Sequence, residues 1–153
     1  MNDVDDILIS IRREYVDKIL TGEKTIELRR RSLHVQRGTR VWIYSKAPDA
    51  IIQVSGVIDD IVRASPHQLW CKYRNRTGVS YADFRSYFGD VEIGCAIFLK
   101  DIRRLKNEIS LSAIRREVQS FRPPQFYAKL KSDNPTLRVL RASAIHGCQS
   151  SEA

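Results

Sequence analysis

Residues 22–31, with the sequence GEKTIELRRR, carry the pattern from which the fold is predicted. They follow a short run in which apolar residues recur at helical spacing, and a glycine after such a run is a common helix terminus. Apolar and polar residues then alternate, as they do on a strand whose successive side chains point to opposite faces. Ile26 and Leu28 are expected on one face, and Glu27 and Arg29 on the other. The stretch therefore predicts a helix, a turn and a strand that places a carboxylate beside a guanidinium.

Lys24 lies in the turn that leads into this strand, and it completes the leading candidate site with Glu27 and Arg29. A lysine or an arginine gives a phosphate a charge partner, and a carboxylate accepts a hydrogen bond from an amino group such as that of cytosine. The alternative is an ion-pair ladder that only fixes strand register. Both interpretations remain open on the sequence alone.

Outward from this stretch, the apolar pattern predicts further strands and helices. Strands are expected at residues 7–11, 41–44, 52–58, 91–99 and 102–105. Helices are expected at residues 13–20, 65–73, 80–88 and 111–118, and the prolines of residues 121–127 indicate an extended segment. Five or six short strands with helices inserted between them predict an α+β fold built on a small curved sheet or barrel.

The length and the charge of the chain limit the number of domains and the kind of partner. The 153 residues predict one domain over residues 1–140, with a flexible tail at 141–153. The 26 Lys and Arg residues exceed the 18 Asp and Glu residues, for a net charge of +8. This balance favours a polyanionic partner, nucleic acid first, although some basic proteins are basic only for solubility.

Several classes of protein are not suggested by the sequence. The longest apolar run, residues 93–99, is too short to span a bilayer, and the first six residues are acidic where a secretory signal is basic. The three cysteines share no ligand-like spacing with one another or with a histidine. We therefore expect a cytoplasmic protein with no membrane partner, no metal site and no tightly bound cofactor.

The helix, turn and strand around residues 22–29 closely resemble the signature of the ASCH domain, glycine-x-lysine-x-x-glutamate-x-arginine after a short helix. The resemblance extends less sharply through residues 41–48 and 121–127, so it covers most of the chain to about residue 130. It implies a PUA-like β-barrel with short helices around it and a cleft lined by the motif residues. It also implies a role with RNA, single-stranded DNA or a modified nucleoside.

An enzymatic role is the alternative that the same resemblance raises. One branch of the family resembles acetylcytidine amidohydrolases, whose catalytic lysine falls on Lys24. Their nucleophilic threonine falls on Glu27 and their catalytic glutamate on Thr77, so two of three positions depart. Some relatives are reported as ribonucleases, and for that activity Lys24 and Tyr44 are candidate contributors. If the chain is an enzyme, Lys24 and Glu27 are the candidate catalytic residues.

Three further groups of residues are candidates for nucleic-acid binding. The triple arginine at the end of the motif makes Arg31 a candidate for contact with phosphate. The end of the next strand could supply an aromatic ring, a hydroxyl and a positive charge to one ligand. A predicted helix interleaves aromatic and basic residues, which suits single strands, although core packing is the stronger explanation of its aromatic residues, which lie at i and i+3. The candidates in the last two groups are Tyr44, Ser45 and Lys46 on the strand, and Trp70, Tyr73, Arg74 and Arg76 on the helix. An adaptor for an acidic protein partner is a third possible role.

Overall fold

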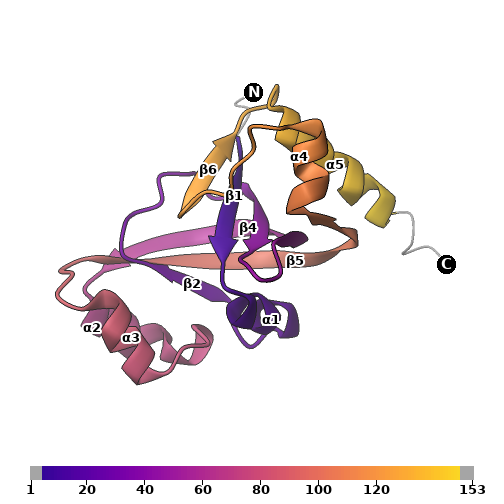
Figure 1. Ribbon diagram of the computed structural model, residues 1–153. Helices are drawn as coiled ribbons and strands as arrows, with labels where there is room; N and C mark the ends of the chain where they lie inside the picture. The colour runs from indigo at the N-terminus through magenta and orange to yellow at the C-terminus, as the bar shows by residue number, and fades with distance from the viewer. Residues whose placement is uncertain (1–4, 149–153) are drawn as a thin grey trace.

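The structure, a computed structural model, describes residues 5–148. Within this range six strands form one curled sheet, in the order β2-β5-β4-β3-β1-β6, and short helices lie around it (Figure 1). The strands are β1 (Asp6–Ile11), β2 (Ile26–Arg29), β3 (Arg40–Ser45), β4 (Ile51–Ala64), β5 (Gly94–Ser110) and β6 (Tyr127–Leu130). The helices are α1 (Arg13–Thr21), α2 (Pro66–Tyr73), η1 (Arg74–Arg76), α3 (Tyr81–Phe88), α4 (Leu111–Glu117) and α5 (Pro135–Cys148). The expected α+β, barrel-like fold is confirmed.

The long strands β4 and β5 form the spine of the sheet. β1 and β3 run parallel, and the other neighbouring strands are antiparallel. The pairing of β4 with β5 shifts register three times, once around Gly56. A Cβ atom at Gly56 would lie 2.7 Å from Cδ1 of Ile102, so the two strands approach closely where the spine bends.

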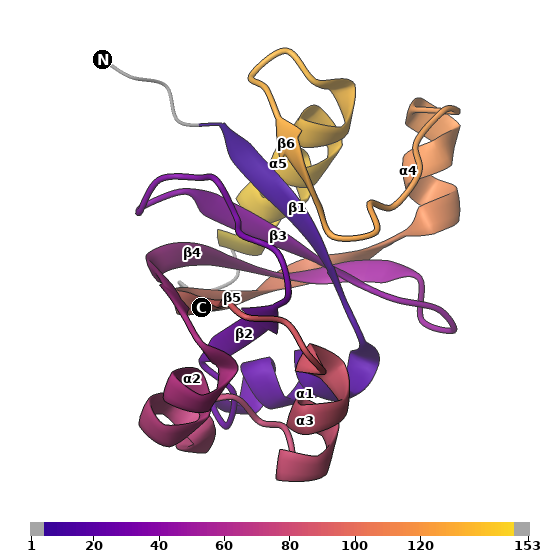
Figure 2. The ribbon, with the colours of Figure 1, turned by 90° about the vertical axis from the view of Figure 1, so that its left-hand side faces the viewer.

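The two ends of the molecule hold different helices. Figure 2 shows α1, α2 and α3 together at one end, and α4 and α5 at the other. Among the described helices, none is both long and apolar enough to cross a membrane. The end that carries α1, α2 and α3 is the one that also holds β2.

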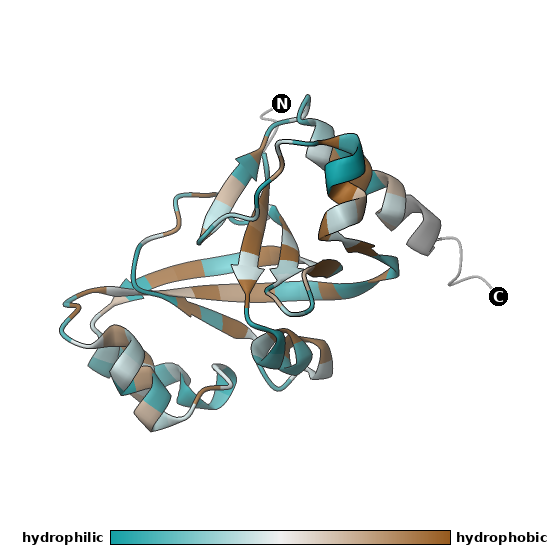
Figure 3. Ribbon diagram, in the orientation of Figure 1, coloured by the Kyte–Doolittle hydropathy of each residue, from teal (hydrophilic) through white to brown (hydrophobic). Residues whose placement is uncertain are grey.

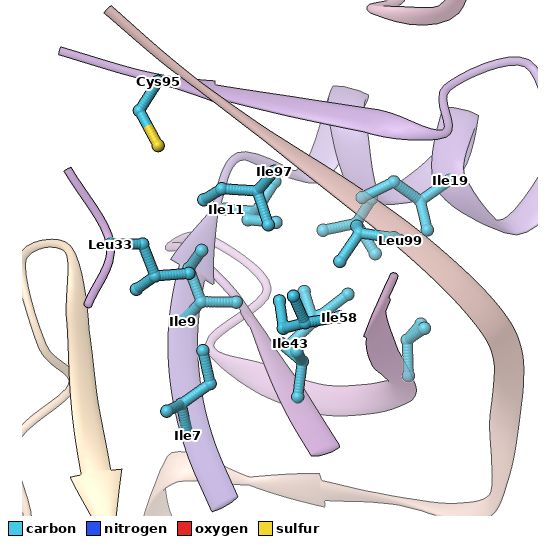
Figure 4. Close-up of a cluster of buried hydrophobic side chains, with 13 residues drawn as sticks. Ile7, Ile9, Ile11, Ile19, Leu33, Ile43, Ile58, Cys95, Ile97 and Leu99 are labelled. Atoms are coloured by element: carbon cyan, nitrogen blue, oxygen red, sulfur yellow. The ribbon is translucent and has the colours of Figure 1, made fainter. Parts of the chain in front are cut away.

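Three apolar clusters support this arrangement. An inner cluster fills the curl of the sheet, where Ile9, Ile43 and Ile97 are buried (Figure 4). A second cluster lies beneath α4 and α5, and a third beneath α2 and α3. Hydrophobic and hydrophilic residues are mixed along the long strands β4 and β5, whereas β1 is mostly hydrophobic and buried along its whole length (Figure 3). The third cluster is the one that holds β2 in place.

The helix start signals in the sequence are confirmed. Ser65 and Gln68 form the capping box that begins α2, with Pro66 at the first helical position. Ser80 caps α3 through the backbone N–H of Asp83. The middle helices therefore begin where the sequence predicts.

Two predicted strand boundaries are corrected. The strands expected at 91–99 and 102–105 are one strand, β5, which passes through Asp101 at a φ of +51°. β4 runs on to Ala64 instead of ending at residue 58. Helix α5 continues to Cys148 and buries Leu137 and Leu140, and residues 149–153 of the expected tail lie outside the described residues. The apolar pattern predicts neither β6 nor α5.

Candidate functional site

The strand β2 separates an apolar face from a charged face, as the alternation of its residues predicts. Ile26 and Leu28 lie in the cluster beneath α2 and α3. Glu27 and Arg29 point to the other side, where Nη2 of Arg29 donates to Oε2 of Glu27 at 2.6 Å. The pair is largely buried, with side-chain exposures of 8% for Glu27 and 12% for Arg29. The predicted juxtaposition of carboxylate and guanidinium is therefore present.

Lys24 joins this pair from the turn after α1. Its Nζ lies 3.2 Å from Oε1 of Glu27 and donates to the carbonyl oxygen of Thr77 at 2.6 Å. The ammonium also lies 5.0 Å from the centre of the Tyr15 ring, within the range of a cation–π contact. One residue further along the loop, Nζ of Lys18 donates to the carbonyl of Gly78 at 2.7 Å. Two lysines thus hold consecutive carbonyl groups of the segment between α2 and α3.

Burial and charge shift the pKa values of this group. Burial lowers the pKa of Lys24, and the neighbouring charges of Arg29 and Lys18 act in the same direction against the opposing effect of Glu27. Burial alone would raise the pKa of Glu27, but the charges of Lys24 and Arg29 outweigh it and hold that pKa below its ordinary value. Glu27 is therefore an ionised carboxylate whose oxygens are both engaged.

Arg29 makes contacts beyond the carboxylate. Its Nη2 also donates to the carbonyl of Ser10 at 2.7 Å, and its guanidinium lies 4.8 Å from the centre of the Phe126 ring. Its Nε is buried and has no hydrogen-bond partner within the described structure. Because an unsatisfied buried donor is costly, this atom can gain from a ligand or water that brings an acceptor.

A cavity of about 410 Å³ opens above these residues, and we call it the central pocket. This volume is within the range of about 300–1,000 Å³ that is usual for small-molecule sites. Lys24, Glu27 and Arg29 lie among its buried residues, whereas Arg12 and Lys46 are exposed at its rim. Tyr15 of α1 and residues of α3 also line it; those of α3 are Asp83, Phe84, Ser86 and Tyr87.

The rim of the central pocket gathers positive charge. Burial lowers the pKa of Lys46, and the nearby charges of Arg29 and Arg12 lower it further. Arg12 is also 3.6 Å from Glu14, but both side chains are more than half exposed, so this contact is weak. Like charges at such a rim are stabilised by an anion that comes between them.

The other residues predicted from the sequence lie elsewhere. Tyr44 is buried in the cluster beneath α4 and α5, and Ser45 is fully buried and bonded to Asp49. Arg31 is exposed beyond the end of β2, and Arg74 lines a separate groove on the far side of α3. Trp70 lines the same separate groove as Arg74, and Tyr73 and Arg76 both contact the ring of Phe98. The central pocket thus combines Lys24, Glu27, Arg29 and Lys46 but none of the other candidates.

Sequence reasoning does not find the lining that comes from α1 and α3. Helical spacing marks Tyr15 only as an apolar helix position, and nothing in the local pattern marks Ser86 or Tyr87 as neighbours of a strand some 60 residues earlier. Arg12 lies at the junction of β1 and α1 and belongs to no motif that marks it as a site residue. Within residues 5–148, no group of three or more His, Cys, Asp or Glu side chains could hold a metal ion.

Comparison with known proteins identifies the family. The family model described as "domain of unknown function" DUF365 matches residues 5–119, which is most of the chain. The chain belongs to the DUF365 family. The matched residues include the motif stretch and the residues of α1 and α3 that line the central pocket.

Solved and curated relatives place this DUF365 member among ASCH proteins. An ASCH domain-containing ribonuclease from Zymomonas mobilis is 29% identical over 148 residues, which cover 95% of this chain and 99% of that protein. The crystal structure of an ASCH protein from the same species superposes with a TM-score of 0.82 at 27% identity, over 90% of this chain and 94% of that one. A tyrosine-to-phenylalanine variant of it gives 0.83 at 26% identity, over 90% and 97%. The ASCH resemblance of the motif is confirmed.

Proposed function

We propose that this protein binds RNA and that the central pocket takes one nucleotide of the strand. The observation that carries the proposal is the excess of positive charge in the pocket. Four cationic side chains line it, Lys24, Arg29, Arg12 and Lys46, against the carboxylates of Glu27 and Asp83. A relative that matches nearly the whole chain is named a ribonuclease, which favours RNA over other polyanions.

The arrangement suggests how the parts of a nucleotide would be distributed. The exposed cations at the rim, Arg12 and Lys46, suit a phosphate group, and the buried Nε of Arg29 lacks an acceptor within the described structure. The rings of Tyr15 and Tyr87 offer faces for a base. This assigns the phosphate to the rim and the base to the space between α1 and α3.

In this arrangement Glu27 is not free to accept a hydrogen bond from the base of the nucleotide. Its two oxygens already meet Lys24 at 3.2 Å and Arg29 at 2.6 Å. Asp83, at the start of α3, is the other carboxylate of the pocket lining and takes over the role of acceptor for an amino group of the base. Glu27 instead orients the two cations.

RNA cleavage is the second candidate function, favoured by the ribonuclease relative and by the lowered pKa of Lys24. A lysine whose pKa is lowered loses its proton more readily and can then serve as a base, and Glu27 beside it would stabilise the protonated form. Lys24 is only 1% exposed, so the reacting group would have to reach it from within the pocket. An acetylcytidine amidohydrolase activity has less support, because the position of its nucleophile is held by the paired Glu27.

Binding is tested by titrating a labelled single-stranded RNA with the protein and following fluorescence anisotropy. Single-stranded DNA of the same sequence and a panel of modified cytidines serve as competitors. Lys46→Ala and Arg12→Ala should each weaken RNA binding, and Arg103→Ala, an exposed arginine on β5 outside the central pocket, should not. Equal affinity in all four proteins would remove the central pocket from the binding site.

Cleavage is tested separately by mass spectrometry of RNA incubated with the protein. Products that disappear in Lys24→Met, with the fold intact by circular dichroism, would establish an enzyme that uses this lysine. Binding without products would establish a protein that only binds RNA. Products that persist in Lys24→Met would assign the chemistry to other residues.

A further inference from the structure

A second hollow lies between α2 and α3, on the other side of α3 from the central pocket. It has a volume of about 800 Å³, and we call it the α2–α3 groove. Trp70 of α2, Arg74 of η1, and Tyr81 and Arg85 of α3 line it. Phe84 of α3 lines both hollows, so this one helix separates them. Figure 2 shows α2 and α3 at the same end of the molecule as α1.

Aromatic rings form one side of the α2–α3 groove. The ring centre of Trp70 lies 5.0 Å from that of Tyr81 and also 5.0 Å from that of Phe84. Phe84 is buried, so its contact with Trp70 belongs to the core. Tyr81 is 52% exposed, which burial in the core does not explain. An exposed ring held against a tryptophan offers a face on which a planar group can stack.

Positive charge accompanies these rings. The guanidinium of Arg85 lies 5.9 Å from the centre of the Tyr81 ring, and its Nη1 donates to the hydroxyl of Tyr81 at 3.2 Å. Arg74, which follows the end of α2, belongs to the same lining, and Glu92 is the carboxylate in it. A combination of exposed rings with arginines suits single-stranded nucleic acid, whose bases stack while its phosphates meet cations.

We propose that the α2–α3 groove binds the nucleotides that flank the one held in the central pocket. This inference rests on the proposed RNA binding and on the position of α3, whose residues line both hollows, so that one strand can reach from the first to the second. A base stacks on Tyr81 and Trp70, and Arg74 and Arg85 contact the adjoining phosphates. The groove therefore makes the protein prefer a single-stranded oligomer to a mononucleotide.

Tryptophan fluorescence tests the inference directly, because the chain has two tryptophans in contrasting environments. Trp42 is 1% exposed, and its Nε1 donates to Asp6 at 2.9 Å. A base that stacks in the groove quenches Trp70 and leaves Trp42 unaffected. The probes are a mononucleotide and a single-stranded RNA of about eight nucleotides, within the site sizes known for single-strand binders.

The oligomer should quench the fluorescence, and the mononucleotide should bind without quenching. Trp70→Phe should abolish the quenching while keeping a ring in the groove. Tyr81→Ala should weaken oligomer binding about tenfold, as the loss of one stacked base does, and leave mononucleotide binding unchanged. Arg103→Ala is the control for charge, since it removes an exposed arginine that lines neither hollow.

The possible results separate this inference from the proposed function. Tight oligomer binding without quenching, unchanged in Tyr81→Ala, would overturn the groove proposal and leave the central pocket standing. Failure of both probes to bind would overturn the two proposals together. Self-association that is lost in Tyr81→Ala, measured by sedimentation without RNA, would instead make the groove a contact between copies and overturn its role in RNA binding.

Discussion

Glu27 and Arg29 lie two residues apart on β2 and share one buried ion pair, with 2.6 Å between Oε2 and Nη2. Lys24 adds a second cation to the same carboxylate at 3.2 Å. Two cations around one carboxylate leave the group with an excess positive charge at the base of a cavity. The group therefore joins the turn after α1 to β2 and leaves the base of the central pocket positively charged.

Removing the charge of Glu27 should destabilise the protein. Glu27→Gln leaves two buried cations without their carboxylate, and breaking a buried pair in this way costs roughly 3 kcal/mol of unfolding free energy. Urea denaturation measures the change. Glu23→Gln makes the same substitution at an exposed residue four positions earlier and should change the stability by less than about 0.5 kcal/mol. A similar small change in Glu27→Gln would show that the pair contributes little.

The lowered pKa of Glu27 predicts a loss of stability in acid. A carboxylate whose pKa is lower in the folded protein than in the unfolded chain stabilises the fold fully above its unfolded pKa, about 4.3 for glutamate. That contribution disappears as the pH falls through the lower folded value. Unfolding free energies measured from pH 7 down to acid should therefore fall less steeply in Glu27→Gln than in the wild type. Parallel curves would contradict the assigned direction of the shift.

The space around Gly78 and Gly22 predicts different losses of stability when each glycine is replaced by alanine. Gly78 has a φ of +67°, and a Cβ there would lie 3.1 Å from Cβ of Lys24 and 3.2 Å from Cδ of Lys18. Gly22 has a φ of +85° but no atom within 4 Å of that position. Both substitutions to alanine should cost about 1–2 kcal/mol for the left-handed backbone. Gly78→Ala should cost more and should also weaken RNA binding, by displacing the lysine.

Equal losses of stability in the two alanine variants, measured by thermal unfolding, would show that the loop relaxes without moving Lys24. A loss of RNA binding in Gly22→Ala alone would place the important constraint at the end of α1. Comparing the two variants therefore separates the cost of backbone strain from the effect of crowding against Lys24.

The positive rim predicts how binding depends on salt. Each phosphate neutralised on a single strand contributes about 0.7 to the slope of log K against log salt concentration. Lys46→Ala should reduce the slope by about that amount, because it removes one cation from the rim. Affinities measured at several salt concentrations give the slope. An unchanged slope with reduced affinity would assign Lys46 a contact with the base or the sugar.

The sequence predicts the centre of the site better than its walls. The alternation in β2 is a local property, so by itself it predicts that Glu27 and Arg29 share one face of the strand. The walls come from α1 and α3, and no local pattern brings Tyr15 together with Tyr87. Such long-range neighbours depend on how the sheet curls, which periodicity does not determine.

Two other differences have equally physical reasons. Alternation predicts a strand at Tyr44 but not which of its faces lies beneath α4 and α5, so the ring expected to stack on a ligand is instead buried. The apolar pattern breaks near Asp101, which suggests two strands, but the backbone continues through this residue in a left-handed conformation. The sequence shows where the alternation is interrupted but not whether the strand ends there.

Lys18 and Lys24 hold the segment between α2 and α3 by its carbonyl groups alone. A carbonyl oxygen is the same whatever side chain its residue carries, so these two bonds restrict the residue type only at Gly78, where a Cβ would crowd both lysines. During evolution the inserted helices are thus free to change their surface, and with it the preferred ligand, while the attachment to α1 is inherited intact. The two lysines and Gly78, and not the rest of the segment, are the residues in which such a protein family should tolerate the least variation.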